Sequence, residues 1–243
     1  MFVNPEDLTS KEVVVRGSEA RHLSRVLRLK AGARIEVFDG SGLVCLAEIT
    51  KMSRSGIHGQ ILSSRRVGLE PPFLTLAMAV LKGRKMDMVI QKATELGARE
   101  LIPLLSANCA APPPVDSQRR RWQRISLEAC KQCGRPSPLI CGRVLTCAEL
   151  MDRVPEFDER FIFWEDERRH GLPVVIPAAC RSMLIIVGPE GGFTNDEVTS
   201  AREHGCSSTG LGNLILRAET AAIAGMAVCQ FMLGNLGLSR GNS

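Results

Sequence analysis

The sequence predicts an α/β protein with a parallel sheet, preceded by a small β-barrel domain. Short β-prone runs dominate the first 62 residues, and a polar segment with two prolines, residues 63–72, then ends this pattern. From Phe73 onward, buried strand-like runs alternate with helical stretches. This alternation favours parallel strands, because each helix carries the chain back across the sheet. We therefore expect two domains, residues 1–70 and residues 71–243.

The first domain is expected to be a barrel that carries one helix. Asp39-Gly40 and Ser55-Gly56 favour turns between its strands. The β-prone runs lie at residues 13–15, 35–38, 43–49 and 57–62. A helix is expected from Ser18 to Leu29, with its arginines on one face and Leu23, Val26 and Leu27 on the other. The arginines of this helix are Arg21, Arg25 and Arg28.

The second domain is expected to contain four buried strands and four helices. The strands lie at residues 73–80, 101–105, 161–164 and 183–187. The helices lie at residues 86–96, 119–133, 196–204 and 218–233. Thr194 and Glu197 have the spacing of a capping box, which marks a helix start directly after the glycine-rich turn Gly188 to Gly192.

This glycine-rich turn follows a buried strand, and open α/β sheets bind ligands at the carboxyl ends of their strands. It does not fit a dinucleotide fingerprint, because Pro189 removes a backbone N–H group. It does not fit a P-loop, since no Lys-Ser/Thr pair follows and Glu190 would repel a phosphate. A carboxylate here suits a ligand that is neutral or cationic nearby. S-adenosylmethionine, with a sulfonium and no phosphate, meets that condition.

The charge distribution fits a polyanionic partner. The net charge of +5 is uneven, with +4 over residues 1–69, −1 from Glu70, +6 over residues 82–135 and −4 over residues 136–243. The basic part suits RNA, and the acidic part contains the proposed cofactor loops. Ordinary solvated surface charge is the alternative explanation.

Composition favours a globular cytoplasmic protein. The first 12 residues lack the apolar run of a signal peptide, and Ala218 to Leu233 is too short and too interrupted by glycine to span a membrane comfortably. Nine cysteines without an export signal argue for reduced thiols. Cys130 and Cys133 lack a second ligand pair at metal-binding spacing, so we expect a structural role for them and no metal.

Four blocks together carry a family resemblance. They are Arg21 to Arg28 with Phe38 to Gly42, Gln91 to Gly97, Ala129 to Arg135, and Met183 to Gly192 with Leu211 to Ala221. In this order they resemble the RsmE-type small-subunit ribosomal RNA uridine N3-methyltransferases of the SPOUT superfamily. Nearly the whole chain is spanned, and the combination is more specific than any single block.

The resemblance implies a SPOUT-type parallel sheet with a C-terminal deep trefoil knot, preceded by a PUA-like barrel that binds RNA. It implies S-adenosylmethionine as cofactor and methyl transfer to N3 of a uridine in 16S ribosomal RNA of the small subunit. It also implies a homodimer. The apolar helix from Ala218 to Leu233 is compatible with such an interface and equally with burial inside one subunit. Alternatives are a SPOUT enzyme for another RNA, or a non-catalytic RNA-binding protein with this fold. A nucleotide-dependent oxidoreductase fits Glu190 poorly.

Arg217 and Glu219 are the candidate catalytic residues that the resemblance indicates. Arg217 would stabilise the negative charge that develops on the uridine carbonyl oxygens, and Glu219 would orient it or accept a proton. Alternatively, the two form an ion pair that holds the loop closed.

The expected cofactor-binding residues lie in loops after strands. They are Trp164, Glu165, Val187, Gly188, Pro189, Glu190, Gly191, Gly192, Leu211, Gly212, Ile215, Leu216, Thr220 and Ala221. Ile215 and Leu216 would contact the adenine or, alternatively, fill the core beneath the loop.

The expected RNA-binding residues are basic. They are Arg21, Arg25, Arg28, Lys82, Arg84, Lys92, Arg119, Arg120, Arg121, Arg124, Lys131 and Arg135. Arginine suits phosphates because its guanidinium donates two parallel hydrogen bonds. Lys92 has a second interpretation, as an ordinary i, i+3 surface pair with Glu95.

The chain departs from the family pattern at its N-terminus, where Met1 to Asn4 lack an arginine that many relatives carry, and at three positions near its C-terminal end. Asn213 and Leu214 replace a Pro-Arg pair, and Ala218 replaces a threonine. The role of the arginine missing from that pair is therefore dispensable or taken by another residue.

Overall fold

The computed structural model describes residues 1–53, 55–109 and 115–237. It divides into two compact units, Met1–Gly68 with Cys130–Pro138, and Leu69–Ala129 with Leu139–Ser243. In this division Cys130–Pro138 belongs with the first unit, although the sequence places it within residues 71–243.

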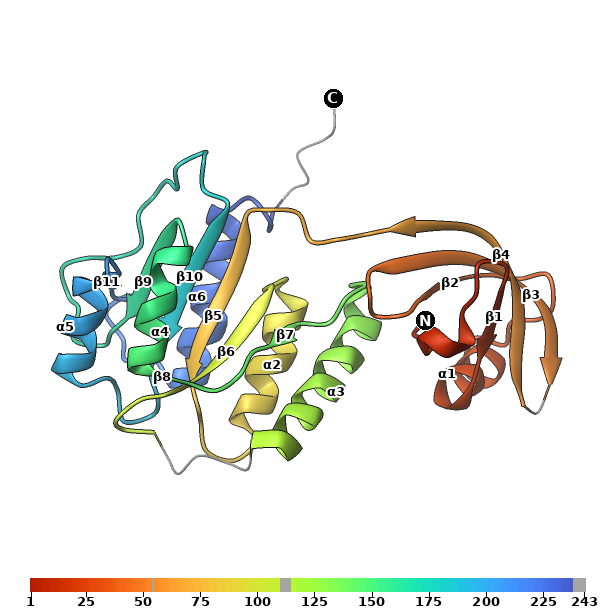
Figure 1. Cartoon of the computed structure of the whole chain (residues 1–243), viewed down its shortest axis with the longest axis horizontal. Helices are drawn as coiled ribbons and strands as arrows, with labels where there is room; N and C mark the ends of the chain where they lie inside the picture. The colour runs from red at the N-terminus through yellow and green to blue at the C-terminus, as the bar shows by residue number, and fades with distance from the viewer. Residues whose placement is uncertain (54, 110–114, 238–243) are drawn as a thin grey trace. The chain divides into compact units, whose positions relative to one another are not determined.

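The first unit is built on a four-stranded antiparallel sheet in the order β1-β4-β3-β2. Its strands are β1 (Glu12–Val15), β2 (Arg34–Phe38), β3 (Leu43–Ser53) and β4 (Gly56–Arg66). The segment before β1, which contains a 3₁₀ turn (Pro5–Asp7), reaches both edges of the sheet (Figure 1). Phe2 bridges to Phe38 on β2, and Leu8 bridges to Val13 on β1. The open sheet is thereby partly closed into a barrel.

The helix of the first unit is shorter than the sequence indicates. α1 (Gly17–Arg21) continues as a π-helical turn (His22–Val26), and Arg28 has a left-handed φ of 51°. Leu23 enters the barrel core, whereas Val26 and Leu27 are exposed. The expected helix to Leu29 is therefore wrong in its last turn. Arg28 does not continue the helical face of Arg21 and Arg25, because the chain has already left the helix.

The second unit contains a seven-stranded parallel sheet in the order β11-β9-β10-β5-β6-β7, with β8 also paired to β6. Its strands are β5 (Phe73–Ala79), β6 (Glu100–Leu105), β7 (Ile140–Cys141), β8 (Leu145–Thr146), β9 (Glu159–Phe163), β10 (Ser182–Val187) and β11 (Ser207–Thr209). The expected parallel sheet is confirmed. β7, β8 and β11 are absent from the sequence prediction, because two or three residues show no usable periodicity.

Helices cover both faces of this sheet (Figure 1). One face packs against α2 (Lys85–Glu95), α3 (Val115–Cys133) and α6 (Ala218–Met232), and the other against α4 (Cys147–Arg153) and α5 (Asn195–Glu203). A 3₁₀ turn (Val154–Glu156) follows α4. Along β5, Leu74, Leu76 and Met78 face the first layer and Ala77 faces the second. This two-residue alternation is why the strand is apolar throughout.

The position of β10 determines where the loops lie. β10 lies between β9 and β5, and β11 lies on the far side of β9. All these pairs are parallel, so the loops after β9, β10 and β11 leave from the same edge of the sheet. The segment after β5, which begins α2, leaves from this edge as well. The deep trefoil knot stays a prediction of the family resemblance.

The core beneath this edge depends on a close approach at Gly225 of α6. A Cβ atom at this position would overlap the ring of Phe163 at the end of β9. A glycine in mid-helix costs about 1 kcal/mol relative to alanine. The close packing of α6 on β9 explains why a glycine stands at this position despite that cost.

Gly225→Ala is therefore expected to destabilise the protein. The overpacking cost of about 1–3 kcal/mol exceeds the helical gain. Denaturant unfolding measures the change. In a Phe163→Ala background the same substitution should become neutral or stabilising, because the ring is gone. Equal destabilisation in both backgrounds would show that Phe163 is not the cause.

Candidate functional site

A pocket of about 400 Å³ lies where the loops after β9, β10 and β11 meet the start of α6. This volume lies within the range of small-molecule sites. Its lining residues are Lys85, Phe163, Trp164, Glu165, Val187, Gly188, Pro189, Glu190, Gly192, Gly210, Leu211, Gly212, Leu214, Ile215, Leu216, Arg217, Ala218 and Ala221.

All of the predicted cofactor residues except Gly191 and Thr220 line this pocket. Gly191 faces Asn108 instead, whose Cβ would lie 3.0 Å from a Cβ placed on the glycine. Thr220 is exposed on α6. Whether the lining residues bind a cofactor stays a prediction at this point.

Sequence reasoning missed five lining residues, namely Lys85, Phe163, Gly210, Leu214 and Ala218. Gly210 and Phe163 directly precede predicted residues. Lys85 belongs to the Lys-Gly-Arg-Lys segment after β5. From the sequence, Lys82 and Arg84 of this segment were predicted to bind RNA, whereas Lys85 was not.

The glycine-rich turn after β10 is held by its neighbours. Gly192 has φ +71°, and its N–H group donates to Pro189 O at 3.1 Å. A Cβ atom on Gly192 would collide with Glu165 Oε1, so the turn approaches the loop after β9 closely. Asn108 Nδ2 donates to the carbonyl oxygens of Gly191 and Gly192, each at 3.1 Å. These contacts fix the turn before any ligand is present.

The predicted capping box that starts α5 is confirmed. The Thr194 side chain accepts from Glu197 N at 3.2 Å, and Glu197 Oε2 accepts from Thr194 N at 2.9 Å. Glu197 Oε1 also accepts from Ala107 N at 2.8 Å. The cap therefore joins the helix start to the loop that carries Asn108.

One lysine serves two carboxylates at the pocket. Lys85 Nζ lies 2.9 Å from Glu190 Oε1 and 3.9 Å from Glu219 Oε2. Glu190 Oε1 also accepts from Lys82 N at 3.3 Å. Burial by itself raises the pKa of Glu190, but the hydrogen bonds from Lys85 and from backbone N–H groups outweigh it and hold the pKa below its ordinary value. Glu190 is therefore ionised at neutral pH, and Lys85 partly balances its charge.

Arg217 and Glu219 lie at the start of α6. Arg217 is the N-cap residue, lines the pocket and is exposed. The Glu219 side chain is 12% exposed, and its Oε2 atom is buried with no hydrogen-bond partner among the described residues. Among the described residues, Glu219 forms its ion pair with Lys85 and not with Arg217. The expected alternative, an Arg217–Glu219 pair that closes the loop, is therefore not the arrangement observed.

The loop before α6 presents apolar side chains at the pocket. Leu214 and Ile215 are 81% and 75% exposed, while Leu216 is half-buried. Ile215 therefore does not fill the core beneath the loop. Leu214 occupies the position of the missing family arginine, and the guanidinium of Arg168 reaches the same loop, 3.5 Å from Asn213 O.

Several predicted RNA-binding residues are exposed. In the first unit, Arg21 and Arg25 line an open hollow beside the β3–β4 hairpin, with Met52 and Gly56 on its other wall. Arg28 is exposed as well. In the second unit the exposed residues of this set are Lys82, Arg84, Arg120, Arg121 and Arg124.

Other residues of the set have partners within the protein. Lys92 pairs with Glu95 at 2.7 Å, as its second interpretation states, and does not line the pocket. Arg121 forms a bidentate pair with Asp87, at 2.9 and 2.5 Å. Lys131 Nζ lies 3.1 Å from Glu19 Oε1.

Two arginines of the set are covered to different degrees. Arg119 is half-buried. Arg135 is only 8% exposed, and burial lowers its pKa. Arg135 therefore does not present a surface contact to RNA, because packing covers the guanidinium.

The described part of the chain has no cluster of metal ligands and no helix that could span a membrane. It contains no group of three or more His, Cys, Asp or Glu side chains that would hold a metal ion. Its helices are all too short or too polar to cross a bilayer. The nine cysteines are free thiols, and α3 ends at Cys133 with Gly134 in the left-handed conformation, as its sequence predicts.

Comparison with known proteins identifies the family. The RNA methyltransferase domain family matches residues 69–230, and the RNA methyltransferase PUA domain family matches residues 15–62. The ribosomal RNA small subunit methyltransferase E of Rickettsia conorii is 30% identical over 90% of this chain and 88% of its own. The chain belongs to the RsmE family of RNA methyltransferases. The enzyme of the same name from Bacillus subtilis is 28% identical over 89% of both chains.

Solved structures agree with this RsmE assignment. The ribosomal RNA small subunit methyltransferase E of Neisseria gonorrhoeae, bound to S-adenosylmethionine, has a TM-score of 0.81 and 31% identity over 96% of both chains. A Legionella pneumophila protein in complex with the same cofactor has a TM-score of 0.76 and 27% identity, over 95% of this chain and 96% of its own. The SPOUT-type α/β sheet and the PUA-like first domain are thus those expected of the RsmE family.

Lys85→Gln is expected to raise the pKa of Glu190, because it removes the ammonium group beside the carboxylate. Titration of the glutamate carboxyl carbons by NMR measures this. The pKa of Glu190 is lower in the folded than in the unfolded state. The Lys85–Glu190 ion pair therefore stabilises the folded protein at neutral pH, and this contribution is lost as the pH falls and Glu190 becomes protonated. The loss of stability in the variant should therefore be larger at pH 7 than at pH 3.

Lys82→Gln is the matched control, because only the backbone N–H group of Lys82 reaches Glu190. Its Glu190 pKa should equal that of the unmodified protein. An equal rise in both variants would contradict a specific role for the Lys85 ammonium.

Proposed function

We propose that this RsmE-family protein transfers the methyl group of S-adenosylmethionine to N3 of a uridine in 16S ribosomal RNA of the small subunit. The observation that supports this is the pocket at the sheet edge, with Arg217 on its wall and Glu219 beside it. The Neisseria gonorrhoeae relative, which is bound to S-adenosylmethionine, adds support for the cofactor.

The lining residues fit this cofactor. The pocket combines apolar walls from Phe163, Leu211 and Ile215 with glycine backbone at Gly188 and Gly212. Apolar walls with a few polar groups are typical of adenosine-sized sites.

Charge points the same way. Three carboxylates, those of Glu165, Glu190 and Glu219, lie at or beside the pocket. Among the described residues, the two cations there are Lys85 and Arg217, so one negative charge is left unbalanced. This excess suits a ligand with a cationic centre.

The reaction needs a deprotonated nitrogen and a positioned methyl group. When bound, S-adenosylmethionine supplies the electrophilic methyl of its sulfonium. In our proposal Glu219, whose Oε2 atom has no hydrogen-bond partner among the described residues, accepts the N3 proton of the uridine. Arg217 stabilises the negative charge that then spreads to the flanking carbonyl oxygens. The N3–C bond forms as the S–C bond breaks, and the cofactor leaves as a neutral thioether. Correct placement of the two reactants supplies much of the rate.

The exposed arginines of the first unit would bind the RNA backbone. Arg21 and Arg25 line one hollow, and guanidinium groups bind phosphates bidentately. Binding should weaken steeply with salt, because phosphate contacts release counterions. A salt-independent affinity would argue against this role.

A homodimer and a cytoplasmic location belong to the same proposal. Val228 and Phe231 are exposed apolar side chains on α6, which supports an interface there. Sedimentation as a monomer at high micromolar concentration would contradict the dimer. Ribosomal RNA is the substrate we propose, so recovery of the protein outside the cytoplasmic fraction would contradict the location.

The decisive test of the cofactor is calorimetry with S-adenosylmethionine. Ala221→Leu should weaken its affinity by about tenfold or more, because the larger side chain enters the pocket while leucine keeps the helix. Ala224→Leu, on the same helix outside the pocket lining, is the control and should bind normally. Failure of the unmodified protein to bind at millimolar cofactor would favour the non-catalytic alternative, which the exposed Leu214 makes worth testing.

The catalytic roles are tested by kinetics on small-subunit particles. Glu219→Gln and Arg217→Gln should each lower kcat by about 10² or more. Affinity for the cofactor should change by a much smaller factor than kcat, because both groups act on the uridine in the reaction, although Arg217 lines the pocket and Glu219 places a negative charge beside it. Mapping of modified bases in 16S ribosomal RNA, with and without the protein, identifies the target. Loss of cofactor affinity at unchanged kcat would reassign both residues to binding.

A further inference from the structure

Glu167 is a buried carboxylate in an exposed loop. It lies three residues after Trp164 in the loop that follows β9, and its side chain is 8% exposed. Its neighbours Asp166, Arg168, Arg169 and His170 are all exposed. Burial of a charge is costly unless hydrogen bonds compensate for it. Glu167 does not line the cofactor pocket, so contact with that ligand does not explain it.

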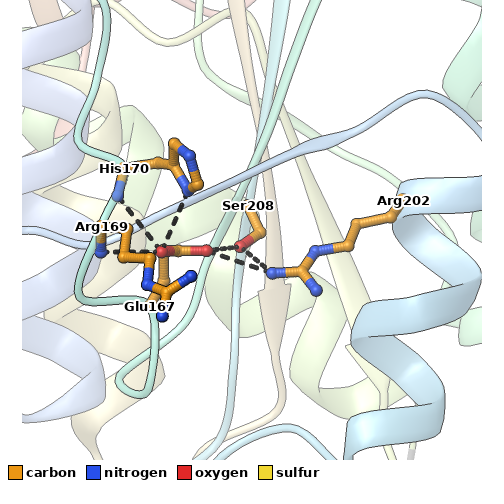
Figure 2. Close-up of polar contacts among 5 residues, drawn as sticks. All are labelled: Glu167, Arg169, His170, Arg202 and Ser208. Atoms are coloured by element: carbon orange, nitrogen blue, oxygen red, sulfur yellow. Dashed lines mark hydrogen bonds and ion pairs between the residues drawn. The ribbon is translucent and has the colours of Figure 1, made fainter.

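Both oxygens of Glu167 have partners, as Figure 2 shows. Oε1 accepts from Arg169 N at 2.9 Å and from His170 N at 3.1 Å, and lies 3.2 Å from His170 Nδ1. Oε2 accepts from Ser208 Oγ at 2.7 Å and from Arg202 Nη2 at 3.1 Å. Arg202 Nη2 also donates to Ser208 Oγ at 2.8 Å. We call these five residues the Glu167 cluster.

The partners come from the loop after β9, from β11 and from the last turn of α5. Arg169 and His170 belong to the loop after β9, which carries Trp164. Ser208 lies on β11, whose loop begins at Gly210. Arg202 lies on α5, the helix that the glycine-rich turn enters. A single carboxylate therefore joins the loop after β9 to β11, which leads into the loop at Gly210, and to the last turn of α5.

Contacts between the loops lie beside the cluster. Trp164 N donates to Thr209 O at 3.1 Å, and Gly210 N donates to His170 O at 2.8 Å. The Arg202 guanidinium lies 5.4 Å from the Trp164 ring centre, within cation–π range. Trp164 and Gly210 both line the pocket. Movement of the Glu167 side chain would therefore loosen two walls at once.

The cluster is charged at neutral pH. The N–H group of Arg169 and the hydroxyl of Ser208 are the main causes that lower the pKa of Glu167 to about 2. The carboxylate thus keeps its acceptor role over the range in which enzymes of this kind are assayed.

We propose that Glu167 is a positioning residue, which holds the loops after β9 and β11 against α5 and so shapes the pocket in advance of cofactor binding. The proposal rests on the function proposed above, because the ligand is S-adenosylmethionine. Pre-organised walls lower the ordering cost that binding would otherwise carry. Glu167 acts through Trp164 and Gly210 and does not touch the reacting atoms.

Glu167→Gln is the informative substitution. It keeps the size of the side chain, but the groups that face the two oxygens are donors. The amide NH₂ of glutamine would therefore meet donors on one side in either orientation. Asp166→Asn is the matched control, because it makes the same chemical change at the adjacent, exposed position of the loop.

The first measurement is hydrogen exchange of the free protein. The amides of Trp164 and Gly210 should exchange about tenfold faster in Glu167→Gln, because local opening costs less free energy. Asp166→Asn should match the unmodified protein. This readout needs no ligand, so it tests the role of Glu167 even if the proposed cofactor does not bind.

The second measurement is cofactor binding and kinetics. Glu167→Gln should weaken S-adenosylmethionine binding and raise its KM by about tenfold, with kcat at saturating cofactor within about twofold. The KM for the RNA should not change. If Glu167 merely stabilised the fold, its substitution would lower Tm but would not raise the cofactor KM at nearly constant kcat.

Ser208→Ala provides a second variant if Glu167→Gln folds poorly. It removes one hydroxyl from the cluster. As in Glu167→Gln, exchange at Trp164 and Gly210 should become faster and cofactor binding weaker, but by smaller factors. Unchanged exchange at Trp164 and Gly210 in the folded variants would overturn the proposal, as would a fall in kcat at unchanged cofactor KM. Absence of S-adenosylmethionine binding in the unmodified protein would instead refute the proposed function.

Discussion

Parallel pairing of β10 between β9 and β5 is the constraint on which the site depends. It brings the loops after β9, β10 and β11 to one edge of the sheet, beside the start of α2. Residues as distant in the chain as Lys85, Trp164 and Arg217 therefore share one pocket. Gly225 lets α6 approach Phe163, and Gly192 lets the turn after β10 approach Glu165. Both close approaches need the absence of a side chain.

Carboxylates fix the walls of this pocket, each in a different way. Glu190 and Glu219 both form an ion pair with one ammonium group, that of Lys85. Glu197 caps α5 and holds the neighbouring loop through Ala107 N. Glu167 joins its own loop to β11 and α5. Part of the acidic character of residues 136–243 therefore has a structural reason, since these carboxylates hold neighbouring segments together.

Much of the fold was predictable because local signals agreed with the tertiary structure. The continuous apolar runs of β5 and β10 indicate strands buried on both faces, and the Thr194 cap indicates the start of α5. The short strand β11 was missed, because Ser207 to Thr209 has no apolar pattern. The helix after Gly17 was overextended, since arginine and leucine spacing gives no sign of the left-handed Arg28.

The sequence by itself determined the α/β class, the glycine-rich turn after β10 and the family. It also indicated most of the pocket lining, because those residues directly follow strands. Only the tertiary structure decided which charges meet. Lys85 joins Glu190, Arg135 is buried, and Glu167 collects donors from α5 and β11. Such pairs depend on three-dimensional distances between segments far apart in the chain, which strand and helix periodicity does not encode.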